Sequence, residues 1–322
     1  MSRRKRTTKF LIGLIAIIFL SASIAPYLLY RNQERIVLAA VEELNKRQNG
    51  HLIYKKSKIS PLKQFPYISI EIDSIYFFQD KSNSLDTTSL PIYSIEELYL
   101  GFDAWKILGG EFDIKELTIH GGNLNLLTDE DGRINLLLAK SSNQEIERQA
   151  GASDNISLNI EKLHLRNFFI DKTNEKLQQH YQFHVKKADL SFNYGQDSID
   201  IALKASMQVG DFEVEKFHFL QNKQLDVQVQ GGYGQKSGFI TLDPSSIELE
   251  GVELNLDGSV ATKDSIRLDL ALNGQKKNFD ILLNFAPNNI QKQAKAFQNE
   301  GDIFFIGKIK GPIQYGLPSV DI

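Results

Sequence analysis

The sequence contains no cysteine among its 322 residues, and it has few prolines. The absence of cysteine excludes disulfide bonds and a lipid anchor attached to cysteine. Only 8 prolines stand against 22 glycines, and isoleucine, leucine, valine and phenylalanine are abundant, which favours strands. Apolar residues make up 42% of the chain and aromatic residues 10%, as in ordinary folded domains. The length suffices for one large domain or two small ones.

Acidic residues outnumber basic residues after the N-terminal tail. The whole chain carries a formal net charge of −3. Without the five basic residues of the tail, 32 Lys and Arg face 40 Asp and Glu, which leaves a net charge of −8. Nucleic-acid binding depends on clustered cations that contact phosphates. We therefore expect no nucleic-acid partner.

Residues 10–30, FLIGLIAIIFLSASIAPYLLY, carry no charge. About 20 apolar residues suffice to cross a bilayer as a helix. The tail before them, residues 1–9, holds the basic residues that set the topology: Arg3, Arg4, Lys5, Arg6 and Lys9. Such a flank stays cytoplasmic, which predicts a single-pass anchor and an exported body. A cleaved signal peptide is the alternative, with cleavage between Ser21 and Ala25, but Pro26 and the continuing apolar run favour an uncleaved anchor.

Helical periodicity is confined to two segments after the anchor. Residues 31–50 form a predicted juxtamembrane helix, with apolar side chains on one face and a helix end at Asn49-Gly50. Residues 288–299 form the second predicted helix, which begins after Pro287. The rest of the chain is expected to be β.

Most of the remaining chain alternates apolar and polar residues with period two. Such alternation gives a strand one apolar face and one wet face, which predicts a curled antiparallel sheet and argues against parallel α/β sheet. A first β group is predicted at 51–140 and a second at 155–322, separated by a flexible polar loop at 141–154. The residues expected on the apolar faces are Ile68, Ile70, Ile72, Leu124, Leu126, Ile156, Leu158, Leu225, Val227, Leu268 and Leu270.

A recurring pattern breaks this alternation by one residue, and a β-bulge would explain each break. The pattern occurs at Ile72-Ile75-Phe77, Ile95-Leu98-Leu100, Ile114-Leu117-Ile119 and Ile160-Leu163-Leu165. Turns between strands are predicted at Gly109-Gly110, Gly121-Gly122, Asp131-Gly132, Gly231-Gly232 and Asp257-Gly258.

Several segments resemble the AsmA family of envelope proteins. After a helix ending in LNKRQNG, the chain continues HLIYKKSKISPLKQFPYISIEIDSIYF, like the family's two leading strands with an aromatic-proline loop, here Phe65-Pro66. The most specific segment is IEELYLGFDAWKILGGEFDIKELTIHGGNLNLLTDEDGRINLLL, with G-x-L-x-L at 122–126 and D-x-D-G-x-x-N-L at 129–136. The final segment, GDIFFIGKIKGPIQYGLPSVDI, is similar to the family's G-x-x-x-x-x-G-x-I-K-G strand.

The resemblance implies membership in the broader group of bridge-like lipid-transfer proteins. Their sheets curl into a long open groove with an apolar inner face that holds phospholipid acyl chains. The family sits in the bacterial inner membrane, with its bulk in the periplasm, and it serves outer-membrane and envelope assembly. Many relatives are much longer, and residues 317–322 read like the start of another strand. We therefore expect a short member or a fragment, and no full bridge between two membranes.

The candidate metal-binding, phosphate-binding and catalytic motifs have ordinary structural explanations in the sequence. His180 and His184 are expected on one strand, about 13 Å apart, too far to share a zinc ion. The segment 129–132, DEDG, lacks a full series of calcium ligands and is read as a turn. The segment 231–237, GGYGQKS, is read as a hairpin rather than a phosphate loop. No G-x-S-x-G motif is present, so we predict no enzymatic activity, no metal and no cofactor.

Three functions remain in view. The leading hypothesis is a non-enzymatic inner-membrane protein that binds or transfers phospholipid in an apolar β-groove. The second is an exported interaction or regulatory domain that binds another envelope protein through a sheet edge. The third, a hydrolase, lacks paired carboxylates at a suitable spacing. The basic residues Lys55, Lys56, Lys58 and Lys63 are either a solvated strand face or a contact for anionic headgroups. Whether the apolar residues line an open groove or fill a closed core is left open by the sequence.

Overall fold

The structure is a computed structural model, and it describes residues 24–38, 40–42, 45, 49–79, 90–139, 156–263, 266–277, 302–312 and 319–321. The described chain is mainly β, as predicted, and all of its strands belong to one 15-stranded sheet. The strands are β1 (His51–Ser60), β2 (Ile68–Phe78), β3 (Tyr93–Phe102), β4 (Phe112–Thr128), β5 (Ile156–Asn174), β6 (Gln179–Tyr194), β7 (Ser198–Val214), β8 (Phe217–Phe219), β9 (Lys223–Gly234), β10 (Phe239–Leu242), β11 (Ser245–Leu249), β12 (Val252–Ala261), β13 (Arg267–Lys277), β14 (Asp302–Pro312) and β15 (Ser319–Asp321).

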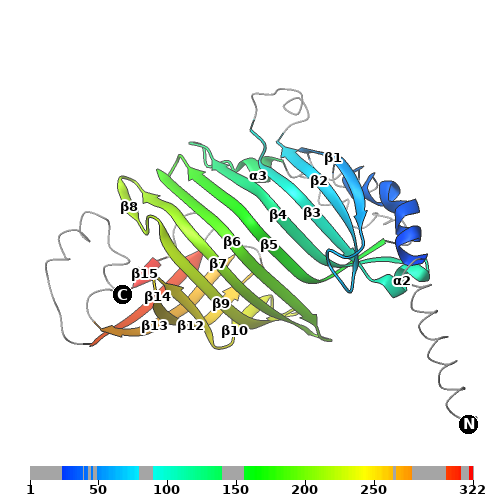
Figure 1. Ribbon diagram of the computed structural model, residues 1–322. Coiled ribbons are helices and arrows are strands. Elements are labelled where there is room, and N and C mark those ends of the chain that lie inside the picture. The colour runs from blue at the N-terminus through cyan, green and yellow to red at the C-terminus, as the bar shows by residue number, and fades with distance from the viewer. Residues whose placement is uncertain are drawn as a thin grey trace, which may run out of the picture.

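The strands follow one another across the sheet almost in chain order. The main path runs β1-β2-β3-β4-β5-β6-β7-β9-β10-β12-β13-β14-β15, while β8 pairs with β7, and β11 pairs with both β9 and β12. Figure 1 shows β1 to β9 as one broad, twisted surface, with β12 to β15 turned at an angle to it. The longest strands, β4 to β7, lie in the middle of this surface and have 16 to 19 residues each.

One strand pair corrects the expectation of a purely antiparallel sheet. β4 and β5 run parallel, with Phe112 opposite Ile156 and Thr128 opposite Asn174. Parallel neighbours need a long crossover connection, because the chain must return to the end of the sheet where the first strand began. Residues 129–155 make that return, and the predicted loop at 141–154 lies within it but outside the described residues.

Positions where opposed residues do not pair line up across the first six strands. Ser74 opposes Glu96 without pairing, Glu96 opposes Gly121 in the same way, and Asn167 continues the line towards β6. Ser74, Gly121 and Asn167 all have positive φ angles, of 55°, 71° and 50°. A second break lies where Ile114 of β4 faces β5. The shift of register between Ile114 and Glu116 agrees with the bulges predicted at Ile114-Leu117-Ile119 and Ile160-Leu163-Leu165, whereas at Ser74 and Glu96 one residue pair is left unformed without a shift of register.

Three of the five predicted glycine turns lie inside strands instead. Gly121-Gly122 falls within β4, Gly231-Gly232 within β9 and Asp257-Gly258 within β12. At Gly122 the φ angle is 129°, and a Cβ atom would lie 2.2 Å from the carbonyl oxygen of Ser94. Glycine is needed here because a neighbouring strand approaches closely, and no reversal of the chain is involved.

Helices are few and lie at one end of the sheet (Figure 1). The N-terminal helix comprises residues 24–38, and residues 40–42 and 45 are also helical. Two short helices follow, α2 (Ala104–Leu108), which Asp103 caps, and α3 (Asn135–Leu138). No described helix is both long enough and apolar enough to cross a membrane. Residues 24–30 of the anchor predicted at 10–30 belong to the N-terminal helix, and Ala25 and Leu29 are buried in the core against the sheet. Residues 10–23 of that anchor and the predicted helix at 288–299 lie outside the described residues.

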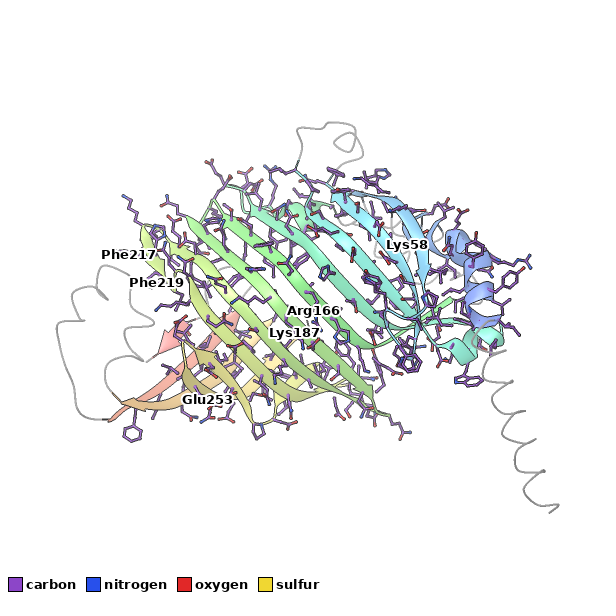
Figure 2. The ribbon with its side chains drawn as sticks, viewed as in Figure 1. Lys58, Arg166, Lys187, Phe217, Phe219 and Glu253 are labelled. Atoms are coloured by element: carbon purple, nitrogen blue, oxygen red, sulfur yellow. The ribbon has the colours of Figure 1, made fainter. Side chains whose placement is uncertain are left out.

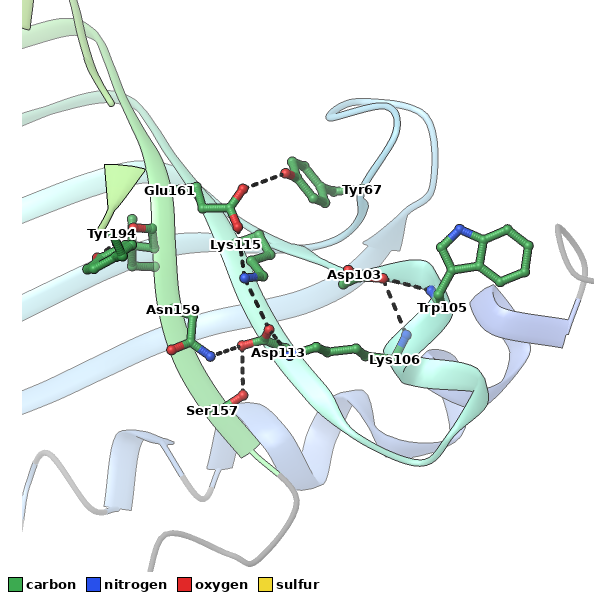
Figure 3. Close-up of polar contacts among 11 residues, drawn as sticks. Tyr67, Asp103, Trp105, Lys106, Asp113, Lys115, Ser157, Asn159, Glu161 and Tyr194 are labelled. Atoms are coloured by element: carbon green, nitrogen blue, oxygen red, sulfur yellow. Dashed lines mark hydrogen bonds and ion pairs between the residues drawn. The ribbon is translucent and has the colours of Figure 1, made fainter. Parts of the chain in front are cut away.

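A buried carboxylate ties this end of the sheet together. Asp113 on β4 is fully buried, and its oxygens accept hydrogen bonds from Lys106 of α2 at 2.6 Å and from Ser157 and Asn159 of β5 at 2.7 and 2.6 Å (Figure 3). Lys115 Nζ lies 3.4 Å from the same carboxylate. Burial alone would raise the pKa of Asp113, but the hydrogen bonds lower it from 3.8 to about 2. One side chain thus joins α2 to both parallel strands.

We predict that Asp113→Asn lowers the free energy of unfolding by about 3 kcal/mol, because a buried ion pair with several hydrogen bonds loses its charge. Urea denaturation of the full chain in detergent, followed by circular dichroism, measures the loss. The control is Asp269→Asn, whose ion pair with Lys310 is exposed and whose loss is expected to cost less than about 1 kcal/mol. Equal effects of the two substitutions would contradict the assigned role of Asp113.

The same carboxylate predicts a pH dependence. The pKa of Asp113 is lower in the folded chain than the ordinary value of 3.8, so the unfolded chain takes up the proton first as the pH falls. Its contribution to stability is therefore complete above about pH 4 and is lost as the pH falls towards 2. The stability difference between the native chain and Asp113→Asn is expected to shrink over this interval. A difference that stays constant from pH 6 to pH 2 would rule this out.

Candidate functional site

One face of the sheet is apolar along continuous cross-strand rows. In the first row Ile70 of β2 opposes Leu100, and the row continues through Leu117, Leu163, Leu190, Leu203 and Val229. A second row runs beside it through Ile72, Leu98, Ile119, Leu165, Ala188, Ala205 and Val227. Because paired residues in neighbouring strands point to the same side, these rows form one surface, the apolar face.

The helices cover the apolar face where the chain begins. Leu29 and Val37 of the N-terminal helix pack in one cluster with Ile70, Phe102 and Ile107, and each of these side chains is at most 1% exposed. This end is a closed hydrophobic core, and it fixes the helix against β2 and β3.

The other end of the apolar face is also buried. Val252, Leu254 and Leu256 of β12 pack with Leu272 of β13, and their exposures lie between 1% and 8%. Ile247 and Val229 lie at the margin of this cluster and are half-buried.

Between these ends the apolar face holds a third cluster of buried side chains, Phe168, Val185, Ala188 and Ala205. Beside this cluster lies a stretch of larger aliphatic side chains that are only half-buried. We call it the central apolar band, and its side chains are Leu117, Ile119, Leu163, Leu165, Leu190, Leu203 and Val229. All described strands belong to one sheet, so no separate second sheet covers the band. Large aliphatic side chains in a closed core are usually fully buried. The band therefore differs from the two closed ends.

The opposite face is polar. Figure 2 shows Lys58, Arg166, Lys187 and Glu253 distributed over it. Asp189 lies near its centre and accepts hydrogen bonds from His164 and Arg166, with Lys187 Nζ 3.0 Å away. Burial raises the pKa of Asp189, but these partners outweigh it and hold that pKa well below its usual range. The charges of this face largely satisfy one another.

Hollows of about 290 to 430 Å³ lie on the polar face of the described sheet. Charged and amide side chains contribute to all of them, for example Lys204 and Asp226 in one and His120 and Arg166 in another. Apolar residues such as Leu203 and Phe169 line them as well. The opposite face differs because aliphatic side chains form the two continuous rows described above.

The predicted apolar residues divide into three environments. Ile68, Ile70 and Ile72 are buried in the closed core under the N-terminal helix. Half-buried positions are occupied by Leu124, Leu126, Leu225, Val227, Leu268 and Leu270. Leu158 is 67% exposed. The side chain of Ile156, like the topology-setting residues of the N-terminal tail, lies outside the described residues.

The central apolar band contains none of the residues first expected at the site. Leu117, Ile119, Leu163 and Leu165 were visible in the sequence as members of the pattern that breaks the alternation. Leu203 belongs to an alternating run, Ile201-Leu203-Ala205-Met207, which carries the same signal. Leu190 stands in the mixed segment KKADLSF, and only its pairing with Leu163 and Leu203 reveals its face.

Two loops read as turns are confirmed as turns. Gly132 donates its backbone N–H to the carbonyl of Asp129, and Arg133 pairs with both Asp129 and Asp131 at 2.8 Å. The segment 231–237 contains the end of β9 and the turn that leads into β10.

Two of the basic residues of β1 are paired with acidic residues of β2. Lys58 lies 2.7 Å from Glu71, and Lys56 lies 3.1 Å from Asp73. Lys63 donates a hydrogen bond to the hydroxyl of Tyr99 at 3.1 Å. These contacts favour the reading of a solvated strand face, with part of its charge neutralised by β2.

Comparison with known proteins adds no relative to this description. No protein-family model matches the chain, and no curated protein matches it. The resemblance to the AsmA family therefore stays a prediction that depends on the quoted segments, and the functional argument depends on the site itself.

Proposed function

We propose that this protein is a membrane-anchored, periplasmic envelope protein that binds or transfers phospholipid without catalysing a reaction. The observation that carries the proposal is the central apolar band, which crosses β4, β5, β6, β7 and β9 in register and stays half-buried between two closed ends. In this proposal the band is the floor of an open groove for acyl chains, while headgroups remain in water.

The energetics favour such a surface as a binding site. Each methylene group removed from water contributes about 0.8 kcal/mol, so ten methylenes contribute about 8 kcal/mol before the cost of ordering the chain. No specific polar contact is needed at this strength. The band crosses five strands, which span about 19 Å at a spacing of about 4.8 Å, and this is close to the length of an acyl chain that crosses half of a ~30 Å hydrocarbon core.

The placement of the N-terminal helix is consistent with loading from a membrane. Residues 24–30 of this helix belong to the uncharged run 10–30 that we predict to be the anchor, and Leu29 packs in the closed core beside β2. A lipid that leaves the bilayer near the anchor would pass this closed core and then reach the central apolar band. We place the protein in the bacterial inner membrane on the strength of the sequence pattern and the resemblance.

We predict that a photoreactive p-benzoylphenylalanine at Leu203 captures phospholipid in living bacteria. The same group at Lys204, the next residue along β7, points to the polar face and serves as the matched control. After irradiation, the full chain is purified and its adducts are identified by mass spectrometry. Phospholipid adducts at least fivefold more abundant at Leu203 than at Lys204 are expected, because only Leu203 belongs to the central apolar band.

A second variant keeps this test decisive. Leu163→Asp places a charge in the band, where burial by acyl chains becomes unfavourable, and it is expected to reduce co-purified phospholipid several-fold, whereas Lys162→Asp is not. Circular dichroism verifies that both variants fold. Equal adducts on both faces of β7, or no lipid at all on a folded chain, would overturn the lipid proposal.

An interaction domain is the second candidate, and one observation favours it. Phe304 and Ile306 of β14 are 69% and 70% exposed, an unusual state for large apolar side chains. An envelope protein that binds there would hide them. Under this alternative, the cross-linker at Leu203 captures no lipid, and a cross-linker at Phe304 captures a discrete protein.

A further inference from the structure

A compact group of metal-binding side chain types lies on the polar face, where β6 and β7 meet near β8. His180 of β6 is the direct cross-strand partner of Glu213, and Asp211 lies two residues before Glu213 on the same face of β7. One ligand atom from each of the three side chains lies within 4.8 Å of the others, and all three side chains are half-buried. The sequence analysis considered His180 only together with His184, and the proposed lipid function uses none of these residues.

A second layer of contacts orients these ligands. His180 Nε2 lies 3.2 Å from both carboxylate oxygens of Asp171 on β5. An imidazole that donates from Nε2 keeps its lone pair on Nδ1, and metal-binding histidines are commonly held by a carboxylate in this way. On the other side, Asp211 contacts His218 Nδ1 at 3.0 and 3.1 Å and accepts a hydrogen bond from Gln221 at 3.0 Å.

The local charge favours a cation. Three carboxylates, Asp171, Asp211 and Glu213, converge here, and the ion pairs described for Asp171 and Asp211 are made with histidines. The three carboxylates together carry a formal charge of −3, which a divalent ion would largely offset.

We infer that His180, Asp211 and Glu213 form a binding site for a divalent transition metal such as Zn²⁺. Imidazole nitrogen and carboxylate oxygen bind Zn²⁺ at about 2.0 to 2.2 Å, with water completing a tetrahedron. Ligand atoms in such a tetrahedron lie about 3.4 Å apart, so side-chain rotation of half-buried residues closes the distance from 4.8 Å. A hollow of about 430 Å³, lined in part by Asp171, opens beside the cluster and gives ions and water access.

A metal here would fasten the end of the β6–β7 pair. Glu213 pairs with His218 of β8 as well as with His180, so the ion would lie where three strands meet. The site is on the opposite face from the central apolar band, and its test is therefore independent of lipid binding.

Metal titration of the untagged full chain in detergent tests the inference. After treatment with a chelator and dialysis, the chain is titrated with Zn²⁺ by calorimetry and with Co²⁺ by visible absorption. We expect one Zn²⁺ per chain, a higher unfolding temperature with Zn²⁺, and tetrahedral Co²⁺ bands. His180→Ala and Glu213→Gln are expected to bind Zn²⁺ at least tenfold more weakly.

The matched control is His184→Gln, which removes another histidine from the same strand, four residues away. His184 contacts Asn167 at 2.8 Å and stacks on Phe169, so its loss should leave the affinity for Zn²⁺ unchanged. Glu213→Gln preserves size and shape, and circular dichroism verifies its fold. Absence of saturable Zn²⁺ binding by the native chain, or native affinity in folded Glu213→Gln and His180→Ala, would overturn the inference.

Discussion

Cross-strand register is the constraint on which the rest of this structure depends. A shift of one residue moves every side chain of a strand to the other face. An isolated bulge on one strand would therefore mix the two faces. Here the unpaired residues Ser74, Glu96, Gly121 and Asn167 stand opposite one another. The alternation of side chains between the two faces therefore changes at the same place in all of these strands. The sheet bends while its apolar side chains stay on one side.

The alignment of the parallel strands β4 and β5 has to be fixed in another way. β4 and β5 are joined by a long crossover rather than by a hairpin, so the local turn does not set their register. Asp113 supplies a fixed point, because its Oδ1 accepts hydrogen bonds from Ser157 and Asn159 of β5 while its Oδ2 accepts one from Lys106 of α2. A buried carboxylate is costly unless it is fully paired, and this one is. The polar cluster thus specifies an alignment that apolar packing alone leaves open.

Period-two alternation was enough to predict a mainly β chain, and the broken alternation at Ile114-Leu117-Ile119 was enough to predict an irregular strand. The parallel pairing was not readable, because a half-exposed parallel strand such as β5 alternates like an antiparallel one. Glycine pairs such as Gly121-Gly122 were misread because a close approach between strands and a tight turn select the same residue.

The candidate sites were less visible still. Ile70 and Leu190 look alike in the sequence, yet one lies under a helix and the other is half-buried in the central apolar band. What covers a residue depends on elements far away in the chain, and the local alternation of apolar and polar residues does not predict it. The grouping of His180 with Asp211 likewise depends on the pairing of β6 with β7.

An open sheet has two margins, and in this one they are chemically unequal. The β1 margin carries Lys55, Lys56 and Lys58, and charge of this kind discourages another strand from adding. At the far margin, β15 has only three residues and covers Lys308 to Lys310, a small part of β14. Within the described sheet, the lysines of β14 stand in the part that β15 already covers, whereas Phe304 and Ile306 in the remainder are exposed. The two margins therefore differ in how strongly charge opposes the addition of another strand.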